Sequence, residues 1–178
     1  MDSIECLTHE RDSELYVSIV ITLVPMSSDE VRHWLDESVQ VFASELSEAS
    51  GMDQGQAMLK AESILSEVVP DGGDTAGHSF RWIMNGIDRV GRVWFGPVAD
   101  RERIVHIWDI EIDPAFRGRG FGGSAIDSVV EEARGMAATA LTLDVFETNP
   151  EAMRLYEKKG FVVGHTTSGQ IEMALDLS

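Results

Sequence analysis

Apolar residues recur along the chain with two periods, which predict an alternation of strands and helices. A run rich in β-branched residues at 15–24 predicts a first strand that Pro25 ends. Helical spacing follows at 27–51, where Ser27 and Ser28 offer N-cap side chains and Gly51 ends the segment. A second helix is predicted from about residue 53 up to the turn at 70–74.

The middle of the chain predicts β structure. Three strands are expected at 80–87, 89–98 and 104–112, and the short turns between them favour an antiparallel meander. The rest of the chain alternates again, with a helix at 125–134, a strand at 141–146, a helix at 149–159 and strands at 161–165 and 171–177. Residues 15–178 are long enough for one buried domain, and the polar segment 1–14 predicts a flexible N-terminal extension.

Charge narrows the range of functions. The chain has 31 acidic and 14 basic residues, a net charge of −17, and most of the excess lies before residue 79. Such acidity argues against a nucleic-acid partner. No apolar run reaches the length of a membrane span, the N-terminus is acidic, and Cys6 has no second cysteine for an intrachain disulfide. We therefore expect a cytoplasmic protein, whose acidic half serves either solubility or a cationic partner.

A glycine-rich turn carries the strongest chemical signal. The run Arg117-Gly118-Arg119-Gly120-Phe121-Gly122-Gly123 follows a predicted strand and opens a predicted helix. Bare backbone N–H groups at a helix N-terminus bind phosphate, and arginine adds charge and bidentate geometry. The turn therefore predicts a site for a nucleotide or a coenzyme.

Two coenzyme classes compete for this turn. Gly118, Gly120 and Gly123 satisfy G-x-G-x-x-G, the dinucleotide fingerprint, and Asp144 stands about where a ribose-binding acid is expected. The context argues against NAD or FAD, because residues 113–117 separate the strand from the first glycine and a meander precedes it.

In another register, the turn and a second block resemble the GNAT acetyltransferase superfamily. Arg117-x-x-Gly120-x-Gly122 is similar to that family's R/Q-x-x-G-x-G/A motif, and residues 149–161 match N-x-x-A-x-x-L-Y-x-x-x-G-F at every fixed position. The resemblance implies an α/β fold with a mixed, mainly antiparallel central sheet and helices on both faces. It implies acetyl-CoA as the acyl donor, and the spacing of the histidines and the cysteine predicts no metal site. A helix with an Asn149 cap and Gly160 at its end would explain much of the second block without any function.

The resemblance also implies roles for particular residues. Tyr156 corresponds to the family's general acid, which protonates the leaving thiolate. Asn149 corresponds to a position that often contacts the pantetheine arm. That arm lies along the strand before the turn, and the pyrophosphate lies on the turn itself. The implied coenzyme contacts are Ile110, Glu111, Ile112, Arg117, Gly118, Arg119, Gly120, Phe121, Gly122 and Gly123.

The general base must come from the residues themselves, because members of the family use different bases. Asp109 and Glu111 interrupt an otherwise apolar strand. Because side chains two residues apart point to the same face of a strand, both acids are expected on one face. Glu111 is the favoured base. His106 falls on the opposite face and is expected to be a satisfied histidine of the sheet. The five histidines and Cys6 show no metal-ligand spacing.

The predicted function is therefore N-acetylation of a small cationic amine or a peptide by direct attack in a ternary complex. In the family the N-terminal helices wall the acceptor side, and here they carry Glu37, Glu45, Glu48, Asp53 and Glu62. A solvated helix face explains these acids equally well. A non-catalytic acyl-CoA-binding module is the alternative. The resemblance to the family, and no feature of the sequence itself, leads us to expect a homodimer.

Overall fold

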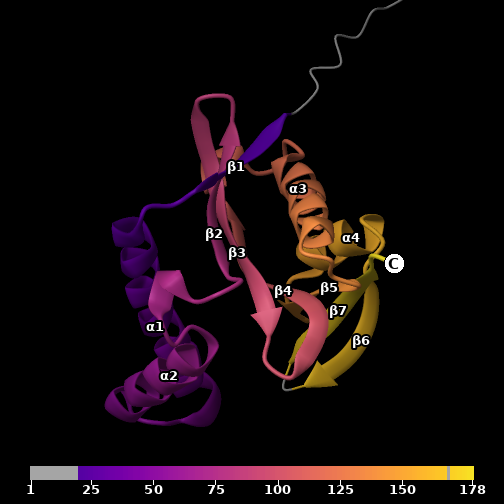
Figure 1. Cartoon of the computed structure of the whole chain (residues 1–178). Helices are drawn as coiled ribbons and strands as arrows, with labels where there is room; N and C mark the ends of the chain where they lie inside the picture. Colours follow the sequence, from indigo (N-terminus) through magenta and orange to yellow (C-terminus); the bar gives the residue numbers. More distant parts are fainter. Residues whose placement is uncertain (1–19, 168) are drawn as a thin grey trace, which may run out of the picture.

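One seven-stranded sheet organises the computed structural model, which describes residues 20–167 and 169–178 (Figure 1). The strand order is β1-β2-β3-β4-β5-β7-β6, and only the β4–β5 pair is parallel. The strands are β1 (Ile21–Pro25), β2 (Ser79–Asn85), β3 (Asp88–Val98), β4 (Arg101–Ile112), β5 (Ala140–Phe146), β6 (Val162–Thr167) and β7 (Gln170–Asp176).

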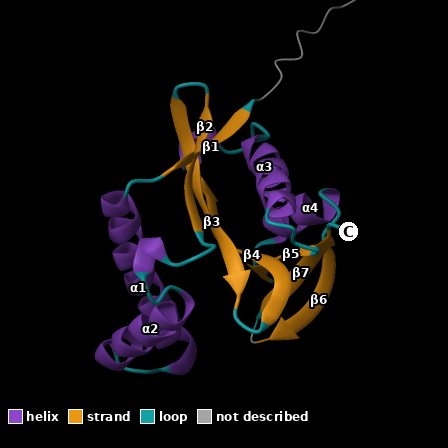
Figure 2. Cartoon of the chain, viewed as in Figure 1, coloured by secondary structure: helices purple, strands orange, loops and turns teal. Residues whose placement is uncertain are grey.

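Helices cover both faces of this sheet. Figure 2 shows α1 and α2 on one side and α3 and α4 on the other. Their bounds are α1 (Ser28–Ser50), α2 (Gln54–Val68), α3 (Phe121–Gly135) and α4 (Pro150–Lys158), with short 3-10 turns η1 (Gly72–Asp74) and η2 (Pro114–Phe116). The predicted fold class, a mainly antiparallel mixed sheet between helices, is confirmed.

Local signals in the sequence explain where α1 and α2 begin and end. Ser27 and Glu30 form a capping box, in which the Ser27 N–H donates to the Glu30 carboxylate at 2.8 Å. Gly51 ends α1 in the left-handed conformation, with φ of 69°. The Asp53 carboxylate then accepts from the N–H groups of Gly55 and Gln56 at the start of α2. Both predicted helices are therefore found.

Two hydrophobic cores lie on the two faces of the sheet. The larger one joins the sheet to α3 and α4, and Phe95, Ile126 and Leu141 are fully buried in it. The other joins α1 to the opposite face and contains Trp34 and Trp94. The N-terminal helices thus form a separate layer over β2–β4.

The structure moves several predicted boundaries. The described part of the first strand starts at Ile21, and residues 1–14 and 15–19 lie outside the described residues. Helix α3 begins at Phe121, four residues before the predicted start at residue 125. The glycines Gly122 and Gly123, which were assigned to the turn, form the first turn of the helix. A Cβ at Gly123 would lie 3.0 Å from the Lys159 side chain, so the missing side chain lets α4 pack against α3. No helix among the described residues has the length and hydropathy needed to cross a membrane.

Gly91 permits an unusually close approach of β3 to β4. A Cβ at this residue would overlap the carbonyl oxygen of Glu111. The alignment of the two strands also shifts nearby, since Trp94 pairs with Asp109 whereas Phe95 pairs with Ile107. This shift is a β-bulge, which kinks a strand and re-aims its side chains.

We expect Gly91→Ala to lower the free energy of unfolding by about 1–3 kcal/mol, the usual range for overpacking. The backbone carbonyl it would meet cannot rotate away as a side chain could. Denaturant unfolding measures the change. Gly135→Ala is the matched control, because Gly135 ends α3 and a methyl group added there would have nothing within 4 Å. Equal stability of the Gly91→Ala and Gly135→Ala proteins would contradict the close approach.

Candidate active site

The glycine turn connects β4 to α3 with backbone that only glycine adopts without strain. Gly118 and Gly120 have φ of 73° and 86°, in the left-handed region. Gly120 is the N-cap of α3 and supplies no side-chain cap, and the first hydrogen bond of the helix runs from the Ser124 N–H to the Gly120 carbonyl at 3.2 Å. The N–H groups of the first turn therefore have no side-chain cap, which suits an anion.

The predicted arginines lie beside this turn. The Arg117 Nε donates to the Ile112 carbonyl at 2.8 Å, and its Nη2 lies 3.5 Å from a Glu111 oxygen. The Arg119 guanidinium lies 5.7 Å from the centroid of the Phe116 ring. The Phe121 side chain, by contrast, is 7% exposed and belongs to the core, so only its backbone is available to a ligand.

Beside the turn, the sheet splits. β4 pairs with β5 only from Ile104 opposite Ala140 to Ile107 opposite Leu143. Beyond this point β5 continues against β7, whereas β4 pairs with β3 alone. The edge of 108–112 that faces β5 therefore has no strand partner, and the predicted contacts Ile110, Glu111 and Ile112 lie on it. These unpaired backbone groups fit the extended amide-bearing arm of coenzyme A.

Tyr156 comes to this region on α4. Asn149 caps that helix, because its side-chain oxygen accepts a hydrogen bond from the Ala152 N–H at 3.1 Å. The predicted capping role of Asn149 is therefore confirmed. Tyr156 is 8% exposed and packs against Phe161, with ring centroids 5.8 Å apart. Burial, with a smaller contribution from the charge of Asp109, raises its pKa to about 12. The phenol therefore keeps its proton at neutral pH.

The two acidic residues of β4 have different surroundings. The Glu111 oxygens lie 3.3 Å from Arg92 and 3.5 Å from Arg117, and Arg92 also pairs with Glu37 of α1 at 3.2 Å. Asp109 is more deeply placed, and burial raises the pKa of its carboxyl group. The Arg92 charge opposes that rise in pKa, and the Glu111 charge adds to it.

The predicted position of His106 on the opposite face is wrong. Its ring lies 4.7 Å from that of Trp108, in the layer that α1 covers, and the Glu111–Arg92–Glu37 chain faces α1 as well. The bulge at Trp108 adds one residue to β4, so simple alternation fails across it. His106 is nevertheless satisfied, because its Nδ1 lies 2.8 Å from the Thr142 hydroxyl. Burial lowers its pKa.

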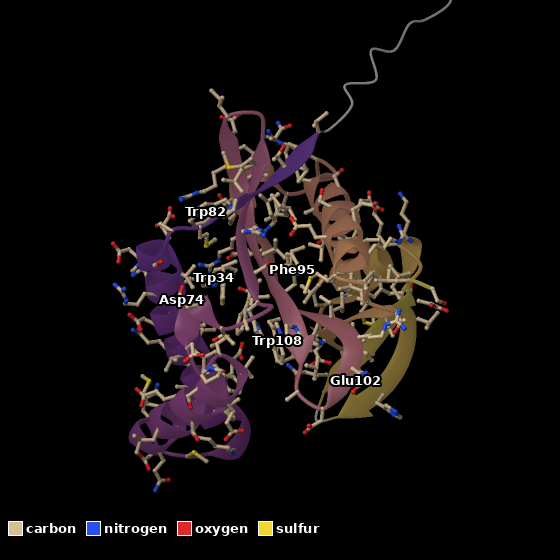
Figure 3. The ribbon with its side chains drawn as sticks, viewed as in Figure 1. Trp34, Asp74, Trp82, Phe95, Glu102 and Trp108 are labelled. Atoms are coloured by element: carbon tan, nitrogen blue, oxygen red, sulfur yellow. The ribbon has the colours of Figure 1, made fainter. Side chains whose placement is uncertain are left out.

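Sequence reasoning missed a wall of aromatic rings on the same face. Stacked or edge contacts run from Trp34 of α1 to Phe80, then to Trp94 and Trp108, with centroids 5.1–5.9 Å apart. Figure 3 shows Trp34 and Trp82 between α1 and the sheet. Tryptophans spread over three strands and one helix give no local signal of such a wall.

A groove of about 440 Å³ runs between α1 and the ends of β2–β4. Two arginines stand over its tryptophans, Arg89 at 4.1 Å from the Trp82 ring and Arg92 at 4.7 Å from the Trp34 ring. Carboxylates outnumber these arginines, and they are Glu30, Glu37, Glu111 and Asp113. Of the acids predicted to wall the acceptor side, Glu37 lines this groove and Asp53 caps α2. The described residues contain no group of three or more histidine, cysteine or acidic side chains suited to a metal ion.

Comparison with known proteins agrees with this geometry. The acetyltransferase (GNAT) family matches residues 32–161. The uncharacterized N-acetyltransferase YdgE of Bacillus subtilis is 29% identical over 147 residues, which cover 82% of this chain and 94% of that protein. The crystal structure of YycN from Bacillus subtilis superposes with a TM-score of 0.72 at 27% identity, covering 83% of this chain and 96% of YycN. A spermidine N-acetyltransferase from Vibrio cholerae, solved with CoA and spermine, shares the fold at a TM-score of 0.59 and 17% identity, over 88% of this chain and 95% of that one.

The chain belongs to the acetyltransferase (GNAT) family. It is an acyltransferase, and its donor is acetyl-CoA, for which the glycine turn and the split between β4 and β5 provide a fitting site. The dinucleotide interpretation of the turn does not hold, because the strand before it belongs to an antiparallel meander and the η2 turn intervenes.

We expect Asp109→Asn to be at least as stable as the natural protein at pH 7. A carboxyl group whose pKa is raised by folding contributes stability that is present below its unfolded pKa and lost as pH rises through its folded value. Asparagine stays neutral at every pH, so the variant does not undergo this loss. The difference in unfolding free energy between the variant and the natural protein should therefore shrink toward pH 3.5. Denaturant unfolding at several pH values measures it, with Asp88→Asn at the exposed start of β3 as the control. A lower stability of Asp109→Asn at every pH would contradict this electrostatic account.

Proposed function

We propose that this protein transfers the acetyl group of acetyl-CoA to the amine of a small cationic molecule or a peptide, by direct attack in a ternary complex. The observation that carries the proposal is the end of the β4–β5 pairing at Ile107, with the glycine turn at one end of the opening and Tyr156 beside it. A donor with a pyrophosphate on the turn would extend its thioester into the opening.

Each chemical need of the reaction has a matching group. The first turn of α3 would hold the pyrophosphate, with Arg117 and Arg119 beside it. A free N–H on the split edge of β4, at Ile110 or a neighbour, would stabilise the oxygen of the attacked carbonyl. Tyr156 would donate its proton to the departing sulfur, since burial keeps the phenol protonated until negative charge develops nearby.

The charge of the groove favours a cationic acceptor. Its four carboxylates exceed its two arginines, and the chain as a whole carries −17. Glu111 lines this groove and also belongs to the part of β4 that lies beyond its pairing with β5. The Vibrio cholerae neighbour acts on spermidine, which is the same class of molecule. A cytoplasmic location and a homodimer stay predictions.

Acetyl-CoA should raise the melting temperature by roughly 5–10 °C at about 100 times its dissociation constant, where binding contributes about 2.7 kcal/mol. NADH and FAD should leave it unchanged. Gly118→Asp should weaken binding by up to about 10³-fold, because a like charge about 4 Å from the pyrophosphate costs on the order of 4 kcal/mol at an effective dielectric constant of about 20.

Gly86→Asp is a close control for Gly118→Asp. Both glycines have a left-handed φ, 64° and 73°, and at neither would an added Cβ have an atom within 4 Å. The two substitutions therefore impose the same backbone strain, but only one stands at the turn. Equal acetyl-CoA affinity of the two variants would place the pyrophosphate elsewhere.

Tyr156→Phe should lower kcat by about 10²-fold, the lower end of the contribution of a general acid. Acetyl-CoA affinity should change little, because the ring still packs against Phe161. Thiol release gives kcat, and the ligand-induced melting shift gives binding. Unchanged turnover would assign Tyr156 to packing, and binding without turnover in the natural protein would favour the non-catalytic module.

A further inference from the structure

The bulge in β4 gives Asp109 a special position. Asp109 pairs with Trp94 across β3, on the face that α1 covers, and it comes two residues after the last pair between β4 and β5. It therefore stands where the split opens. Its charge contributes to the raised pKa of Tyr156, so the carboxylate of β4 and the phenol of α4 lie close enough to influence each other.

Some donors near this carboxylate lack a hydrogen-bond partner. Four buried side-chain nitrogens have none in the described part of the chain, and they belong to Trp34, Arg81, Arg92 and Trp108. Trp34 and Arg92 both act on the pKa of Asp109, and Trp108 precedes it in β4. Trp34 is 3% exposed, and its N–H lies near enough to Asp109 to lower the pKa of that carboxyl group, although the pair does not reach the geometry of a full hydrogen bond. Buried donors without partners are rare, and each calls for an explanation. A polar group seated between them and Asp109 would provide one.

Glu111 is held differently. Each of its oxygens faces a guanidinium group, Arg92 on one side and Arg117 on the other. Arg117 in turn stands at the glycine turn, so this carboxylate links the groove to the coenzyme side. Within the described ranges, no basic side chain comes within ion-pair distance of Asp109. The N–H groups of Trp34 and Ile110 act on this carboxylate, but no described cation neutralises it at ion-pair distance, so its charge is available to an incoming ammonium group.

We propose that Asp109 is the catalytic base that deprotonates the acceptor ammonium, and that Glu111 is a positioning residue that holds Arg92 and Arg117. This inference rests on the proposed N-acetyltransferase function. The Asp109 carboxylate takes one proton from the ammonium, and the freed nitrogen lone pair bonds to the thioester carbon. The carbon–sulfur bond then breaks, Tyr156 protonates the sulfur, and the second nitrogen proton leaves to restore the phenol. The products are an N-acetylated amine, coenzyme A and one proton released from Asp109.

The groups that face Asp109 define its pH behaviour. Arg92 approaches it from β3, Glu111 from β4 and Tyr156 from α4, while Glu37 of α1 acts through Arg92. Burial is the largest influence and raises the pKa of Asp109 toward the range useful for a base. Tyr156, with a pKa of about 12, does not titrate between pH 6 and 10.

The test compares Asp109→Asn, Glu111→Gln and the control Asp88→Asn with the natural protein. Acetyl-CoA and a panel of spermidine, lysine and a lysine-containing peptide are the substrates, and thiol release is followed from pH 6 to 10. Asp109→Asn should lose about 10²–10³-fold in kcat/KM at pH 7, within the range for a general base. The deficit should shrink toward pH 10, where more of the acceptor is already neutral. Its acetyl-CoA melting shift should be unchanged.

Glu111→Gln should keep the shape of the natural pH profile, whatever its effect on acetyl-CoA affinity. A pH-independent deficit in Asp109→Asn, or loss of the acidic limb in Glu111→Gln, would overturn the assignment. If the natural protein binds acetyl-CoA and acetylates none of the panel, carbon-13 NMR titration of the Asp109 carboxyl decides. A pKa at or below the ordinary value of about 3.9 would overturn the base role, and a raised one supports it. Absence of acetyl-CoA binding would instead refute the proposed function, and the NMR titration would still test Asp109.

Discussion

The site depends on the point where two strands stop pairing. β4 and β5 share hydrogen bonds from Ile104 to Ile107, and then each strand follows a different neighbour. Unpaired backbone inside a protein is costly unless another group completes it. The bulge at Trp108 lies where β4 leaves β5, and the close approach at Gly91 lies further along the part of β4 that pairs with β3 alone. The opening is therefore built into the sheet and ends at the glycine turn.

Burial around this opening sets the chemistry of its ionisable groups. The aromatic wall that includes Trp34, Trp94 and Trp108 lies on the side that α1 covers, and the buried Tyr156 of α4 belongs to the core on the other side. The result is a carboxyl group whose pKa is raised and a phenol that holds its proton, both next to the place proposed for the attacked thioester. Shifted pKa values of this kind are typical of functional sites, where they lower the stability of the fold but improve the reactivity of the groups.

The sequence predicted the parts of this arrangement that depend on neighbouring residues. The helix N-cap at Ser27, the end of α1 at Gly51 and the glycine turn that opens α3 all follow from local rules, and the order of elements agreed with the structure. The faces of β4 could not be predicted, because a bulge at Trp108 leaves no mark in the hydrophobic pattern and moved His106 to the side of Asp109. Arg92 was also missed, since it joins residues that only the fold brings together, Glu37 and Glu111.

A crystal structure with a non-reacting acetyl-CoA analogue, in which a methylene group separates the sulfur from the carbonyl, would test the central claim most directly. We expect the pyrophosphate on the N–H groups of 118–123 and the pantetheine arm along 108–112 of β4. The sulfur should lie within reach of the Tyr156 hydroxyl, with the carbonyl open to the side of Asp109. An analogue bound outside the β4–β5 split, or one whose sulfur lies far from Tyr156, would contradict it.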